Sequence, residues 1–66
     1  MRVLFKNMDE DMETILVRSS EKLPSLFPVG TKLRIAGTRF EVEDYRMDFG
    51  RVPDCDDVLV YYLKEI

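Results

Sequence analysis

Two acidic clusters hold the densest groups of metal-ligand side chains in this sequence, Asp9-Glu10-Asp11 and Asp54-Cys55-Asp56-Asp57. Carboxylate oxygens are the ligands that calcium and magnesium prefer. Neither cluster has the glycine or the terminal bidentate glutamate at the spacing of an EF-hand loop. We therefore expect solvated loops with no metal and no other cofactor. Binding of a small ligand or a divalent ion by these acidic loops is the weakest function that we consider.

Nucleophilic catalysis lacks its usual groups in this chain. The sequence has no histidine, so a serine or cysteine nucleophile has no imidazole base and zinc lacks its common ligand set. Cys55 lies between acidic residues, which disfavour its thiolate form. With 66 residues, the chain also has little room for a ligand pocket. We expect no catalytic residue and no enzymatic activity.

A group of basic and aromatic residues gives an alternative function. The group consists of Lys32, Arg34, Arg39, Phe40, Tyr45 and Phe49. Small barrels bind single-stranded nucleic acid with such a combination. The formal charge of −3 opposes this function, because affinity for nucleic acid comes largely from clustered cations. Glu41 and Glu43 are also placed to neutralise the cations, so we expect no nucleic-acid partner.

The basic residues belong to a stretch, residues 30–42, whose pattern predicts a tight β-hairpin. Leu33 and Ile35 alternate with charged residues, and the alternation resumes after Gly37-Thr38. A two-residue loop that begins with glycine predicts a type II′ turn with Gly37 at positive φ. The expected cross-strand pairs are Ile35 with Phe40, Leu33 with Val42, Arg34 with Glu41, and Lys32 with Glu43.

Three further segments have strand patterns: residues 2–7, 13–20 and 58–63. The second contains a β-branched run, Thr14-Ile15-Leu16-Val17, which favours a strand. A helix over residues 8–22 is the alternative, because Asn7 can cap it and apolar residues recur at helical spacing. Residues 19–29, with two prolines, predict a loop whose Leu23, Leu26 and Phe27 cover an open end of the core.

The strand that follows the hairpin turn changes its apolar parity. Phe40 and Val42 are at even positions, whereas Tyr45, Met47 and Phe49 are at odd positions. One face can stay buried through such a change only if an extra residue is inserted, so we expect a β-bulge or a sharp bend near positions 43–44.

These elements predict one small domain over residues 1–66, mainly β. The expected fold is a partly open antiparallel barrel or a strongly bent sheet of 4–5 strands, similar to SH3-like barrels in strand pattern alone. The alternative is an α+β fold with one helix at about 8–22 packed on an antiparallel sheet.

The last predicted strand, residues 58–63, is apolar at every position and therefore expected to be covered on both faces. Cover for the second face comes from residues 23–27 or from another chain. We expect a protein partner, with a two-fold homodimer as one form. The candidate interface residues are Val58, Val60, Tyr61, Tyr62 and Leu63.

The leading expectation for function is a small non-enzymatic protein-interaction module, of the kind found among accessory proteins of bacteria and their phages. A single cysteine and the lack of an export signal predict a cytoplasmic location. No apolar run approaches the length of a membrane span, so we expect no membrane partner. The sequence does not identify the protein partner.

Overall fold

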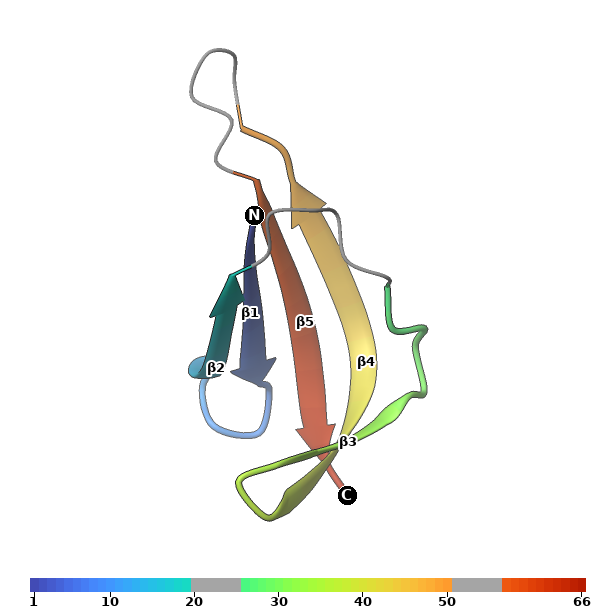
Figure 1. The fold of residues 1–66 in the computed structure, drawn as a ribbon. Helices are drawn as coiled ribbons and strands as arrows, with labels where there is room; N and C mark the ends of the chain where they lie inside the picture. The colour runs from blue at the N-terminus through green and yellow to red at the C-terminus, as the bar shows by residue number, and fades with distance from the viewer. Residues whose placement is uncertain (20–25, 51–56) are drawn as a thin grey trace.

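The computed structural model describes residues 1–19, 26–50 and 57–66, and its strands form one strongly curled sheet (Figure 1). The strands are β1 (Arg2–Asn7), β2 (Glu13–Ser19), β3 (Lys32–Ile35), β4 (Thr38–Asp48) and β5 (Val58–Glu65). The prediction of a mainly β fold is confirmed. The described residues contain no helix, and β2 occupies much of the segment for which a helix was the alternative, so that alternative is wrong.

The strand order is β2-β1-β5-β4-β3, which makes β5 the central strand. The pair β1–β5 is parallel, whereas the other three pairs are antiparallel. The expectation of a purely antiparallel sheet is therefore wrong in one pair. A short hairpin connection requires antiparallel pairing only between strands that follow each other in the chain, whereas three strands separate β1 from β5.

The hairpin has a two-residue turn, but one residue earlier than predicted. Leu33 pairs with Phe40 and Ile35 pairs with Thr38, so the predicted pair of Ile35 with Phe40 is wrong. The central turn residues are Ala36 and Gly37, with φ of 50° and 84°. Positive φ at both positions defines a type I′ turn in place of type II′, whereas the positive φ of Gly37 is confirmed.

The predicted bulge in β4 is confirmed. The register of β4 against β5 shifts between Val42 and Asp44, which leaves Glu43 as the extra residue. Val42 and Tyr45 consequently lie on the same side of the sheet, opposite Leu63 and Tyr61. The inward-facing residues of β4 end at Met47. The expected next one, Phe49, follows the end of the strand and is 69% exposed.

A second irregularity lies in β2. Phe5 pairs with Leu16 and Lys6 with Thr14, so Ile15 is an extra residue opposite β1. Both Ile15 and Leu16 pack against the core. The bulge thus lets two consecutive side chains cover the core.

The core lies on the side toward which the sheet curls, here named the inner face. Its buried side chains come from β1, β4 and β5: Val3, Phe5, Phe40, Val42, Leu59, Tyr61 and Leu63. The opposite side is named the outer face. Of the loop residues expected to cover the core, Phe27 packs on Tyr61, Leu26 is exposed, and Leu23 lies outside the described residues.

Candidate interaction surface

Alternation along β5 divides the five predicted interface residues between the two faces of the sheet. Tyr61 and Leu63 lie in the core with exposed fractions of 1% and 0%. Val58, Val60 and Tyr62 are on the outer face, where Val58 and Tyr62 are half-buried. Because β5 is paired on both sides, a partner can reach it only through outer-face side chains. The candidate interface therefore narrows to these three residues.

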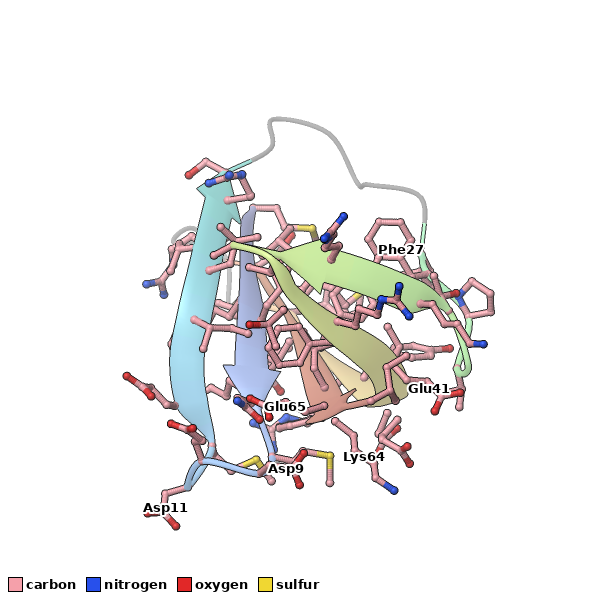
Figure 2. The ribbon with its side chains drawn as sticks, turned by 90° about the horizontal axis from the view of Figure 1, so that it is seen from below. Asp9, Asp11, Phe27, Glu41, Lys64 and Glu65 are labelled. Atoms are coloured by element: carbon pink, nitrogen blue, oxygen red, sulfur yellow. The ribbon has the colours of Figure 1, made fainter. Side chains whose placement is uncertain are left out.

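Tyr61 has a structural role on the inner face. Its ring stacks on Phe5 at 5.3 Å between centroids and lies 5.4 Å from Phe27 and 6.3 Å from Tyr45. The backbone N–H of Phe27 donates a hydrogen bond to the Tyr61 hydroxyl at 2.9 Å. Figure 2 shows Phe27 on the opposite side of the sheet from Lys64. Phe27 therefore covers part of the inner face.

An apolar row crosses the outer face from the sheet edge to its centre. Leu4 lies between Val17 of β2 and Val60 of β5, and Arg46 lies on the other side of Val60. Val60 is buried beneath these neighbours, whereas Val17 at the edge is 49% exposed. The centre of the outer face is therefore apolar although no second layer covers it in the described structure.

The row leads to a hollow of about 460 Å³ at one end of the outer face. Two methionines and a tyrosine form its apolar part, and we name Met8, Met12 and Tyr62 the methionine–tyrosine patch. Met8 and Met12 are 42% and 44% exposed. Asp44, Tyr45 and Arg46 complete the lining, which gives the hollow a charged border of both signs.

The turn between β1 and β2 positions both methionines. The Met8 amide donates to the Leu63 carbonyl at 2.8 Å, which fixes the start of the turn beside β5. Asp11 and Met12 both have positive φ, 52° and 58°. Aspartate tolerates this conformation, but a long side chain such as methionine rarely adopts it. Met8 and Met12 were not among the predicted interface residues, and the only signal in the sequence is a methionine on either side of the acidic run 9–11.

The hairpin carries a basic surface whose cations form no ion pair among the described residues. Lys32 pairs with Glu41, but Arg34 faces Arg39 directly across the strands. The predicted pair of Arg34 with Glu41 is wrong because the turn is one residue earlier, and the predicted pair of Lys32 with Glu43 is wrong for the same reason. Within the described ranges, no carboxylate forms an ion pair with Lys32, Arg34 or Arg39.

The hairpin cations surround a second hollow of about 280 Å³ that has no aromatic residue in its lining. Its remaining lining residues are Leu33 and Ile66. Phe40 and Tyr61 are buried, whereas Tyr45 and Phe49 are exposed elsewhere on the molecule. Cations and stacking platforms are thus separated, unlike the combination expected of a surface for single-stranded nucleic acid.

The acidic turn is organised by hydrogen bonds. Asn7, 3% exposed, donates through Nδ2 to Glu65 Oε1 at 3.2 Å and accepts from the Asp9 amide at 2.9 Å. Asp9 Oδ2 accepts from the Glu65 amide at 2.8 Å. No cluster of three or more potential metal ligands occurs in the described part of the chain. Asp54, Cys55 and Asp56 lie outside the described residues, and Asp57 Oδ1 accepts from the Gly50 amide at 2.9 Å.

Comparison of the chain with known protein families, curated proteins and solved structures found no significant match. Among the described residues, no helix has the length and apolar character needed to cross a membrane.

Proposed function

We propose that this chain is a non-enzymatic protein-interaction module that binds a protein partner at its methionine–tyrosine patch. The observation that carries the proposal is the hollow beside Tyr62, lined by two exposed methionines. The occupant is a bulky apolar side chain of the partner. The single cysteine supports a reducing, cytoplasmic setting for this interaction.

The composition of the hollow supports binding of a protein. Protein interfaces combine an apolar centre with a polar border, and methionine and tyrosine are enriched at them. Methionine adapts its flexible thioether to different surfaces, and tyrosine buries a ring while its hydroxyl stays in water. Asp44 and Arg46 supply charges of both signs at the border, which can fix the orientation of a partner.

The backbone at Met12 also supports a function for the patch. A left-handed conformation costs a residue with a Cβ roughly 1–2 kcal/mol relative to its usual conformations. Asn or Gly would hold the same turn without most of this cost. Retention of a long apolar side chain here, at 44% exposure, is understandable if a partner covers it.

Selection of ligands from a random peptide library tests the proposal. We expect selected peptides to contain a bulky apolar residue and to shift the methyl NMR signals of Met8 and Met12. Tyr62→Ala should weaken their binding by roughly 1–3 kcal/mol, because it removes the largest apolar contact of the patch.

The matched control is Tyr45→Ala. Tyr45 also lines the hollow, but its ring lies on the inner face, near Tyr61. This variant should weaken binding much less than Tyr62→Ala. Peptides whose binding leaves the Met8 and Met12 signals unchanged, or that bind Tyr62→Ala as well as the original chain, would contradict the proposal. Spectra of both variants must first show the folded sheet.

Binding of single-stranded nucleic acid is the second candidate function. The observation that favours it is the uncompensated basic surface of the hairpin, where Arg34 lies opposite Arg39. Like charges directly across two strands are destabilising in isolation, so an anionic ligand would relieve them. The net charge of −3 and the lack of an aromatic residue in the lining of this hollow favour the protein-interaction module instead.

A further inference from the structure

β2 forms one edge of the sheet, and no described strand pairs with its free side (Figure 1). Its seven residues include no proline or glycine, so the whole strand can pair. An edge strand of this kind presents unpaired N–H and C=O groups to a further strand. The other edge strand, β3, has only four residues, of which two are cationic. β2 is thus the edge better suited to sheet extension.

The cross-strand partners of β2 show which of its side chains share a face. Thr14 pairs with Lys6 and Val17 with Leu4, so both lie on the outer face. In a regular strand, residues on the same face are separated by an even number of positions, whereas Thr14 and Val17 are three positions apart. The extra residue Ile15 produces this change.

The two charged residues of β2 lie together on the inner face. Glu13 pairs with Asn7 and Arg18 with Val3, and both Asn7 and Val3 are buried. Ile15 and Leu16, at the middle of the strand, both pack inward. The order of faces along β2 is therefore the same when it is followed in either direction from a centre between positions 15 and 16.

We propose that two copies of this chain pair antiparallel through β2, about a two-fold axis between Ile15 and Leu16. In this register each of residues 13–18 opposes one that has the same face: Glu13 opposes Arg18, Thr14 opposes Val17, and Ile15 opposes Leu16 of the second copy. Because both copies carry the extra residue at the same place, the two bulges oppose each other and the register holds on both sides. A centre on Ile15 or on Leu16 would bring inner-face residues opposite outer-face residues.

The charges of β2 support a second copy as the occupant. Among the described residues, no side chain pairs with the Glu13 carboxylate, and the Arg18 guanidinium donates to the neighbouring Val17 carbonyl alone, at 3.2 Å. The two residues are about 16 Å apart along an extended strand, so they cannot pair within one chain. The two-fold register forms two Glu13–Arg18 pairs between the copies, one at each end of the contact.

The resulting sheet has ten strands, with the outer faces of both copies on the same side. The two methionine–tyrosine patches then lie at opposite ends of one surface. The proposal is independent of what the patch binds.

Charge reversal at β2 tests the pairing. Glu13→Arg places two arginines opposite each other at both ends of the contact, and Arg18→Glu places two glutamates there. We expect each variant alone to associate about tenfold to a hundredfold more weakly than the original chain. An equimolar mixture of the two variants should form a heterodimer of twice the 7.8 kDa mass, and the double variant should form a homodimer. Sedimentation velocity measures the two single variants, their mixture, the double variant and the original chain.

Other outcomes overturn the proposal. A monomer of the original chain at millimolar concentration, single variants that associate as the original does, or a mixture that stays monomeric would each do so. A dimer that is lost in Tyr62→Ala but kept in both charge variants would assign self-association to the methionine–tyrosine patch instead. Amide spectra of the single variants must match the original outside β2, so that loss of folding is distinguished from loss of pairing.

Discussion

Individual residues in two turns of this protein adopt left-handed backbone conformations. Ala36 and Gly37 have positive φ in the hairpin turn, and Asp11 and Met12 have positive φ in the turn between β1 and β2. A Cβ added at Gly37 meets nothing within 4 Å, so any cost of a side chain there is conformational and not steric with neighbours. These turns therefore allow backbone effects to be measured without changes in packing.

The hairpin turn gives the first prediction at this scale. Gly37→Val should lower the free energy of unfolding by about 1–2 kcal/mol, because a β-branched residue resists positive φ. Ala36→Asn should raise it by about 0.5–1 kcal/mol, since asparagine tolerates this conformation and Asn-Gly is a preferred type I′ pair. Urea unfolding measures both changes. Stabilisation by Gly37→Val would show that the turn is not type I′.

Met12 gives a prediction in which stability and binding change in opposite directions. Met12→Asn should raise the free energy of unfolding by about 0.5–1 kcal/mol through relief of the left-handed conformation. The same change should weaken peptide binding at the patch, because it removes an apolar side chain from the hollow. Met8→Asn is the control, since Met8 has no positive φ and should lose binding without gaining stability. Equal stability of both variants would contradict the explanation.

The bulge in β4 determines how the central part of the sheet curls. Deletion of one residue from a strand ordinarily turns every following side chain to the opposite face. Deletion of Glu43 is different, because it restores regular alternation from Val42 onward and keeps Met47 on the inner face. Only the local bend is lost.

We therefore expect deletion of Glu43 to lower the free energy of unfolding by only about 1 kcal/mol, from the lost bend alone. Deletion of Arg46, three residues later, should cost about 2 kcal/mol or more, since Met47 moves outward and Asp48 inward. Chemical unfolding of both deletion variants checks the order. A larger loss of unfolding free energy for the Glu43 deletion than for the Arg46 deletion would show that the bend contributes more to stability than the alternation of faces.

The elements also show how far the sequence predicts this fold. Alternation identifies the strands, the inner residues of the hairpin and the bulge, because burial depends on which face a residue occupies. Alternation does not identify the hairpin register. A turn one residue earlier moves each cross-strand partner by two positions, and a shift of two positions leaves every side chain, such as Leu33 and Phe40, on its original face. The prediction that Glu41 and Glu43 neutralise the hairpin cations depended on the predicted register, so it was wrong as well.

At the scale of the whole molecule, pairing between distant strands limits prediction. The uniformly apolar pattern of β5 indicates a central strand, but not that its parallel neighbour is β1. The candidate surface shows the same limit. Tyr62 was predicted from its own strand, whereas Met8 and Met12 come from a turn that reaches β5 only in the folded sheet.

The charge distribution of the whole molecule gives the last prediction. We expect no measurable binding of a single-stranded oligonucleotide at about 150 mM salt, because the net charge is −3 and the basic surface has no stacking ring. Fluorescence anisotropy measures this. Micromolar affinity that falls steeply with salt and is lost in Arg34→Glu would support the second candidate function.

The central place of β5 has a consequence for synthesis of the protein. Residues 58–65 are made after both hairpins, yet they lie between them and join them into one sheet. On the ribosome, β1–β2 and β3–β4 emerge as separate hairpins, and isolated hairpins are at best marginally stable in water. Their edges and apolar inner faces stay unprotected until β5 emerges. The nascent chain is therefore a candidate for chaperone binding, and folding must wait for its final strand.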